Sequence, residues 1–98
     1  MIPGVGFHPA ARSELFESAD YYDIQSAGLG AEFLDEIERS IKRAIDHPDA
    51  APIVFGRTRK LFVSRFPYSV MYSVDDVGVF ITAIAHHRQR PLYWRGRL

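Results

Sequence analysis

The sequence predicts an α+β domain in which a helical hairpin packs on a small antiparallel sheet, with the element order β-α-α-β-β-β. Two observations predict this fold class. Within residues 59–74, side chains alternate between two faces as they do in strands, and residues 79–85 form a short apolar run. Residues 10–47 instead repeat apolar side chains at helical spacing, on either side of a glycine-containing break. Because neither apolar surface can stay in water, we expect the helices to cover one face of the sheet.

The second half of the chain is expected to form a three-stranded meander. We place its strands at residues 59–66, 68–74 and 79–85, which are rich in aromatic and β-branched side chains. Pro67 cannot donate to a strand ladder, so it belongs at the joint between the first two strands. Residues 75–78 form the turn before the third strand, which is almost wholly apolar and is therefore expected to be buried on both faces.

Alternation also assigns the side chains of the first strand to two faces. Leu61 and Val63 are expected on one face, and Phe62, Ser64 and Phe66 on the other. The second strand divides in the same way, with Tyr68, Val70, Tyr72 and Val74 opposite Ser69, Met71 and Ser73.

The first half of the chain supplies an edge strand and two helices. A short apolar stretch at residues 5–8 is expected to add to the edge of the meander. The first helix covers residues 10–25, after a proline that suits a first helical turn. Residues 26–30 break the pattern, and either of their glycines can supply a left-handed C-cap. The second helix covers residues 31–47 and ends before a proline, and residues 49–58 form a loop.

Each helix has one apolar stripe that should face the sheet. The stripe residues are Ala11, Leu15, Ala19 and Tyr22 in the first helix, and Phe33 or Leu34, Ile37, Ile41, and Ala44 with Ile45 in the second. The acidic side chains of the first helix fall outside its stripe: Glu14, Glu17, Asp20 and Asp23. Acidic residues at this density on a helix most often form a solvated face, so we expect no carboxylate catalysis from them.

Length and composition bound the class of protein. Ninety-eight residues suit one domain, residues 1–98, with a modest core. The absence of cysteine excludes a disulfide framework and a thiolate zinc site. The first residues lack the pattern of a signal peptide, and the longest nearly apolar run, residues 77–85, is shorter than the roughly 20 residues of a membrane span. We therefore expect a cytoplasmic protein that does not enter a membrane.

The net charge of zero hides a division of charge along the chain. Residues 1–56 contain four basic and ten acidic groups, a net charge of −6. Residues 57–98 contain eight basic and two acidic groups, a net charge of +6. The basic residues there are Arg57, Arg59, Lys60, Arg65, Arg88, Arg90, Arg95 and Arg97. With the neighbouring aromatic residues they suit single-stranded RNA or an acidic protein segment equally. The competing interpretation is that the acidic helices pair with the basic sheet inside the fold.

His86 and His87 are the residues best suited to proton transfer near neutral pH. Adjacent residues of a strand point to opposite faces, so the two rings are not placed to bind one metal ion together. We expect no metal and no cofactor. The competing interpretation is a polar strand end exposed to water.

Two segments of the sequence resemble the RelE/ParE superfamily of bacterial toxins, and more narrowly its ParE-like, plasmid-stabilisation branch. They are residues 65–72 (RFPYSVMY) and residues 84–97 (IAHHRQRPLYWRGR). Residues 7–11 and 30–33 of the helical half agree with the same family, so the resemblance covers nearly the whole chain.

The resemblance implies a type II toxin–antitoxin system. In such a system the toxin arrests growth, and a cognate antitoxin neutralises it in a tight complex that can be a heterotetramer or larger. ParE-like members poison DNA gyrase, whereas RelE-like members cleave messenger RNA on the ribosome. A non-toxic family member that only binds an antitoxin is a third alternative. No direct DNA binding is expected without the antitoxin.

Carried over to this sequence, the resemblance gives two sets of candidate residues. The candidates for a ribonuclease site are Lys60, Arg65, His86, Arg90 and Tyr93. The candidates for binding a target or an antitoxin are Arg59, Lys60, Arg65, His87, Arg88, Arg90, Tyr93, Trp94 and Arg95. Phe62 and Ser69 stand where the nucleases commonly carry cations. Because cleavage requires stabilisation of phosphate charge, we favour gyrase inhibition, and whether the chain is an enzyme stays open.

Overall fold

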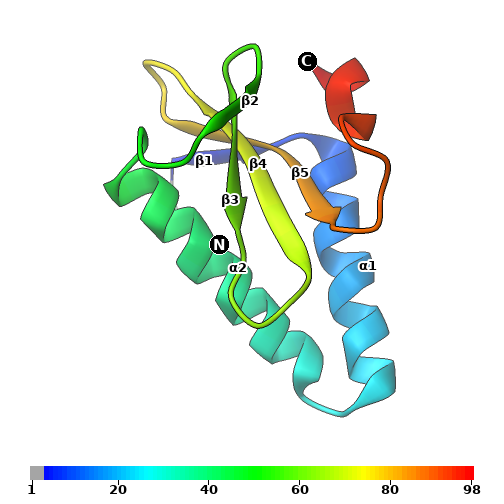
Figure 1. Ribbon diagram of the computed structural model, residues 1–98. Helices are drawn as coiled ribbons and strands as arrows, with labels where there is room; N and C mark the ends of the chain where they lie inside the picture. Colours follow the sequence, from blue (N-terminus) through cyan, green and yellow to red (C-terminus); the bar gives the residue numbers. More distant parts are fainter. Residues whose placement is uncertain (1–3) are drawn as a thin grey trace.

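The computed structural model describes residues 4–98 and contains two helices packed on one face of a five-stranded sheet (Figure 1). The elements are β1 (Val5–Phe7), α1 (Pro9–Gln25), α2 (Leu29–Asp46), β2 (Ile53–Phe55), β3 (Thr58–Phe62), β4 (Tyr68–Val74), β5 (Val79–His86) and a 3₁₀ helix, η1 (Tyr93–Arg97). The predicted α+β fold is confirmed, including the helical hairpin and the order of its elements.

The sheet has the order β1-β5-β4-β3-β2, and it differs from the expectation in two ways. First, β1 pairs with β5 in parallel, which is possible because the helical hairpin carries the chain away from the edge before the meander begins. Second, the expected loop at residues 49–58 contains an additional strand, β2, which pairs with β3. Gly56 has a φ of +55° in the turn between them, a conformation that suits glycine.

The two helices are joined by a short loop that depends on two glycines. Gly28 has a φ of +89° and lies at the start of α2, not at the C-cap of α1, which is Ser26. Gly30 lies where α2 crosses α1, and a Cβ atom there would clash with the carbonyl oxygen of Ala19. The backbone N–H of Gly30 also donates to the Asp23 carboxylate at 2.8 Å. Glycine at position 30 therefore lets the helices approach closely.

The main core lies between the helices and the sheet. The predicted stripes are buried except at Tyr22, which is half-buried, and at Ile45, which is 39% exposed and was wrongly assigned to the stripe of α2. Of the two alternatives in α2, Phe33 is fully buried. Its ring meets the rings of Tyr22, Phe66 and Tyr68 at centroid distances of 5.3, 5.2 and 4.9 Å. These geometries are tilted or edge-to-face, as aromatic clusters prefer.

Phe66 corrects the expected pattern of the first strand. The alternation placed it opposite Leu61 and Val63, but all three belong to the core beneath the helices. The strand ends at Phe62, and the chain then turns through Arg65, which has a φ of +72°. This turn reverses the direction of the side chain, so the period-two pattern does not apply to residue 66.

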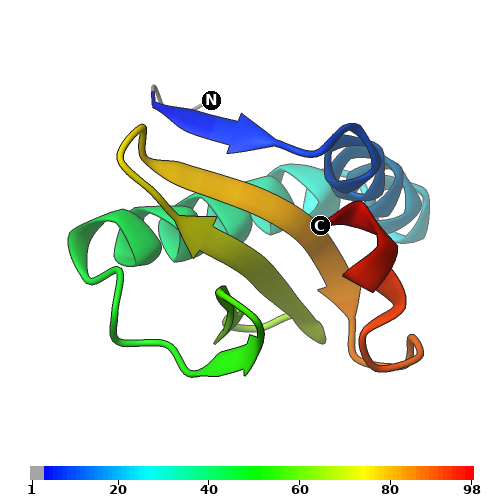
Figure 2. The ribbon, with the colours of Figure 1, turned by 90° about the horizontal axis from the view of Figure 1, so that it is seen from above.

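A smaller core lies on the other face of the sheet, where the C-terminal tail (residues 88–98) packs (Figure 2). Trp94 of the tail is 1% exposed and contacts Met71 of β4 with Ala83 and Ala85 of β5. The prediction that β5 is buried on both faces is confirmed. Among the described residues, no helix is long and apolar enough to cross a membrane.

A bulge in β5 allows both faces to be filled. Met71 pairs with Ala83 and Tyr72 pairs with Ile81, which leaves Thr82 without a partner in the register. The extra residue shifts the alternation by one position. Ile81 and Ile84 therefore both join the helical core, while Ala83 joins the core beneath the tail.

We predict that Phe33→Ala lowers the free energy of unfolding by about 3–5 kcal/mol, because it leaves a cavity among three aromatic rings. The measurement is urea unfolding followed by circular dichroism. Phe16→Ala is the matched control, since Phe16 is 44% exposed and its truncation should cost about 0.5 kcal/mol or less. Equal losses for the two variants would contradict this description of the core.

Candidate functional site

A cavity of about 280 Å³, here called the tail groove, opens on the face of the sheet that carries the tail. Met71 and Ala85 of the sheet contribute buried apolar surface, and Leu92 of the tail adds more. The polar side chains around the groove are those of Lys60, Ser69, His86, His87, Gln89 and Arg90. A groove that combines apolar surface with cations and two imidazoles suits an acidic or partly apolar ligand group.

The two histidines are adjacent at the end of β5 and both line the tail groove, but their rings have different neighbours. The His86 ring lies edge-on to Tyr68, at a centroid distance of 5.0 Å, and its Nδ1 accepts from the backbone N–H of Arg88. The His87 ring lies edge-on to Phe62, and its Nε2 is 3.0 Å from the Ser69 hydroxyl. Local contacts thus fix the orientation of both rings.

The structure brings together four of the five candidate ribonuclease residues. Lys60, His86, Arg90 and Tyr93 all line the tail groove. Arg65 lies elsewhere, because its guanidinium is ion-paired with Glu32 of α2 at 2.8 Å. The Glu32 carboxylate raises the pKa of Arg65, chiefly through their hydrogen bond.

The candidate binding residues fall into two groups. His87, Arg88 and Arg90 are exposed around the end of β5 and the start of the tail, and Arg95 is exposed over the Phe55 ring of β2. Of the remaining candidates, Arg59 and Trp94 make internal contacts, as Arg65 does with Glu32. Arg59 donates to the carbonyl oxygens of Asp49 and Ala51, which braces the loop before β2.

Trp94 is the second residue with an internal role. It is buried between the tail and the sheet, so its surface meets the protein and not a ligand. Its indole fixes the position of the tail, and the exposed side chains on either side of it form the accessible surface.

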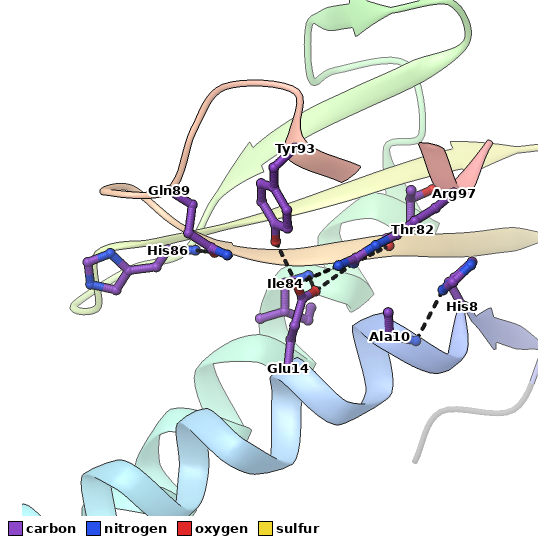
Figure 3. Close-up of polar contacts among 9 residues, drawn as sticks. All are labelled: His8, Ala10, Glu14, Thr82, Ile84, His86, Gln89, Tyr93 and Arg97. Carbon is purple, nitrogen blue, oxygen red and sulfur yellow. Dashed lines mark hydrogen bonds and ion pairs between the residues drawn. The ribbon is translucent and has the colours of Figure 1, made fainter. Parts of the chain in front are cut away.

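Glu14 is the residue that the sequence pattern assigned wrongly. Its carboxylate is not part of a solvated face but lies between α1, β5 and the tail (Figure 3). Oε1 accepts from Arg97 Nη1 at 2.8 Å and from the backbone N–H of Ile84 at 3.1 Å. Oε2 accepts from Arg97 Nη2 at 2.9 Å and from the Tyr93 hydroxyl at 2.8 Å. The spacing of the sequence could have indicated this position. Glu14 lies three residues after Ala11, on the flank of the buried stripe.

The protonation of Tyr93 depends on its burial and on its hydrogen bond to Glu14. Burial raises the pKa of the Tyr93 hydroxyl, and the hydrogen bond to Glu14 raises it further. The hydrogen bond to Glu14 also raises the pKa of Arg97. At neutral pH Tyr93 is therefore a hydrogen-bond donor whose proton is directed to Glu14. Among residues 4–98, no group of three or more His, Cys, Asp and Glu side chains is placed to hold a metal ion.

Comparison with known proteins identifies the family. Residues 5–91 match the model of a family described as the ParE toxin of the type II toxin–antitoxin system parDE. The chain belongs to the ParE toxin family. This confirms the resemblance of its sequence to the ParE-like branch. No curated protein gives a match.

A solved structure has the same fold as this ParE-family chain. It is described as the chromosomal ParDE toxin–antitoxin system from P. aeruginosa, and the TM-score is 0.72 at 19% sequence identity. The match covers 84% of this chain and 92% of the other. At this identity the likeness concerns the fold, and the side chains of the tail groove have to be interpreted from their own geometry.

We predict that Tyr93→Phe lowers the free energy of unfolding by about 1.5–3 kcal/mol near neutral pH, because it removes a hydrogen bond to a carboxylate. Folding raises the pKa of Tyr93 above its ordinary value of 10.0. The contribution of the hydroxyl is thus complete below about pH 10 and is lost as the pH rises through the folded-state value.

The measurement is urea unfolding of both proteins across this pH range. The difference between them should be constant from about pH 7 to 9 and should shrink at higher pH. The control is Tyr21→Phe, which removes a hydroxyl from a side chain that is 57% exposed and should change stability by about 0.5 kcal/mol or less. A small loss for Tyr93→Phe, equal to that of the control, would contradict the assigned hydrogen bond.

Proposed function

We propose that this ParE-family chain is a toxin that arrests bacterial growth by binding DNA gyrase through the tail groove and the cations around it, and that it does not cleave RNA. The observation that carries this proposal is the hydrogen bond from Tyr93 to Glu14. Tyr93 is the tyrosine that a ribonuclease mechanism would use for proton transfer, and here its hydroxyl is directed away from any ligand.

The surroundings of Lys60 support the same conclusion. Cleavage by attack of a 2′-hydroxyl requires proton transfer and donors that stabilise the developing phosphate charge. Phe62 presents an apolar ring that is 59% exposed, and the Lys60 ammonium lies 5.0 Å from the centre of that ring. Ser69 is fully buried and contacts His87. The two positions where nucleases carry cations thus add no positive charge to the groove.

The same surface has features that protein interfaces combine. Ile53 and Phe55 of β2 and Phe62 of β3 are exposed apolar side chains. They lie on the side of the molecule that also carries Lys60 and Arg95. Aromatic anchors next to arginines are typical of residues that dominate binding energy between proteins. We therefore assign this surface to a protein target and not to a nucleic acid.

The antitoxin partner is part of the same proposal. We expect a cognate antitoxin whose acidic segment pairs with the exposed arginines of the tail and which adds a strand or lays a helix on the toxin. Gyrase is a cytoplasmic target in bacteria, so the proposal places the chain in the cytoplasm.

We predict that the purified chain inhibits DNA supercoiling by purified gyrase. Replacing Lys60 and Arg90 together with alanine should raise the half-inhibitory concentration at least about tenfold, because truncating a cation at the centre of an interface typically costs more than 1 kcal/mol. Arg39→Ala is the control, since that side chain is 66% exposed on α2, in the helical layer. Supercoiling that the unchanged chain leaves intact would refute gyrase as the target.

The second candidate function is ribosome-dependent cleavage of messenger RNA. It is favoured by the four candidate residues that line one groove and by the contact between His87 and Ser69. The two functions differ in which synthesis stops first after the chain is induced in a bacterial host. Gyrase inhibition predicts that thymidine incorporation falls before methionine incorporation, and ribonuclease activity predicts the reverse order. If neither falls, the chain is a non-toxic family member that serves only as an antitoxin-binding partner.

We predict that an antitoxin from the same operon co-purifies with the chain. Changing Arg88 and Arg90 to glutamate should weaken the complex at least about tenfold, because like charges would then face each other across the interface. The measurement is isothermal titration calorimetry at two salt concentrations. The charge-matched control changes Arg39 and Lys42, two exposed cations of α2, together to glutamate. Unchanged affinity for the double variant would exclude the tail from the antitoxin interface.

A further inference from the structure

The Glu14 carboxylate connects three parts of the chain that are distant in sequence. It is bonded to Ile84 of β5 and to Tyr93 and Arg97 of the tail, which lie 70, 79 and 83 residues away. The side chains of Glu14 and Arg97 are only 18% and 17% exposed. Their contact is bidentate, with one guanidinium nitrogen on each carboxylate oxygen, which is the geometry that makes arginine pairs strong and directional (Figure 3).

This ion pair also completes an edge of the sheet. β1 pairs with β5 only as far as Ile81, whose carbonyl oxygen accepts from the backbone N–H of His8. Beyond that point the backbone groups of β5 are met by side chains. The N–H of Ile84 donates to Glu14, and the carbonyl oxygen of Thr82 accepts from Arg97. Unpaired backbone groups at a covered edge cost free energy. The ion pair of Glu14 and Arg97 therefore stabilises this edge of the sheet.

The tail has few other restraints. η1 is a five-residue 3₁₀ helix, and such short helices have little stability of their own. Leu92, just before it, has a φ of +60°, a conformation that non-glycine residues adopt only when their surroundings hold them. The position of the tail therefore depends on two anchors, the buried indole of Trp94 and the bonds of Tyr93 and Arg97 to Glu14.

The exposed cations of the tail lie on both sides of these anchors. Arg88 and Arg90 precede Tyr93, and Arg95 lies between Trp94 and Arg97. If the bonds to Glu14 were lost, the segment would be held mainly by the apolar packing of Trp94, and the arginines could no longer keep one arrangement.

We propose that Glu14 is a positioning residue: it closes the tail onto α1 and β5 and thereby holds the arginines of the tail in the arrangement that binds the target. The claim that these arginines bind the target rests on the proposed function. The anchoring of the tail by Glu14 can be measured without that assumption. Glu14 itself contacts no ligand in this assignment, because its four hydrogen bonds are all internal.

Glu14→Gln is the main test, because glutamine keeps the size of the side chain but cannot form the charged bidentate pair. Trypsin reports on the tail, since it can cut after Arg88 and Arg95 once that segment opens. We expect cleavage in the tail to become at least tenfold faster, while amide exchange in β4 stays within twofold of the original. The half-inhibitory concentration for gyrase should rise at least tenfold.

Two further variants make the test specific. Glu17→Gln makes the same chemical change at an exposed position of α1 and should leave both cleavage and inhibition unchanged. Arg97→Lys keeps the positive charge but removes the fork, so it should open the tail as Glu14→Gln does. Arg97→Lys also decides the question if Glu14→Gln fails to fold.

The possible outcomes separate this inference from the proposed function. Tail cleavage that stays at the original rate in both Glu14→Gln and Arg97→Lys would overturn the anchoring. Faster cleavage with full inhibition would overturn the positioning role, because an open tail would then suffice for binding. If the unchanged chain does not inhibit gyrase, the proposed target fails, and the cleavage rates alone still decide whether Glu14 anchors the tail.

Discussion

The structure depends on the need to cover β5 on both of its faces. This strand is central, with β1 on one side and β4 on the other, and its residues from Val79 to Ala85 are almost all buried. The helical hairpin covers one face, where Ile81 and Ile84 join the main core. The tail covers the other face through Trp94. Burial of apolar surface thus determines the position of the tail, whose exposed residues are candidates for binding a target or an antitoxin.

The uneven distribution of charge along the chain has two interpretations, pairing within the fold and binding of a partner. Part of it is used within the fold, where basic residues of the second half meet acidic residues of the first. These pairs are Arg97 with Glu14, Arg65 with Glu32 and Arg59 with Asp49. They differ in their contribution to stability, because Glu14 and Arg97 are both mostly shielded from water. In the other two pairs at least one partner is half exposed or more, so these pairs contribute little. The remaining cations near the tail groove are those that we assign to binding a partner.

The same fold can support different activities, so the side chains of the groove have to decide between them. Here a tyrosine and two histidines lie near cations, which is a composition compatible with acid–base chemistry. Our proposal of a protein target rests on their contacts. Tyr93 donates to Glu14, the His87 ring meets Ser69 and Phe62, and the Phe62 ring lies beside Lys60. An apolar rim with arginines nearby is better suited to a protein surface than to a phosphate backbone.

Local patterns in the sequence determined the elements of this protein, because side-chain periodicity and turn residues act over a few positions. The helices, their stripes, the strand from Tyr68 to Val74 and the buried strand after Gly78 all follow from such patterns. The bulge at Thr82, the reversal of Phe66 and the extra strand β2 do not, since each results from fitting one element against another. The composition of the candidate site was likewise visible in the sequence, but the role of Glu14 was not. Its partners are 70 to 83 residues away, and only the folded chain brings a helix, a strand edge and a tail to one carboxylate.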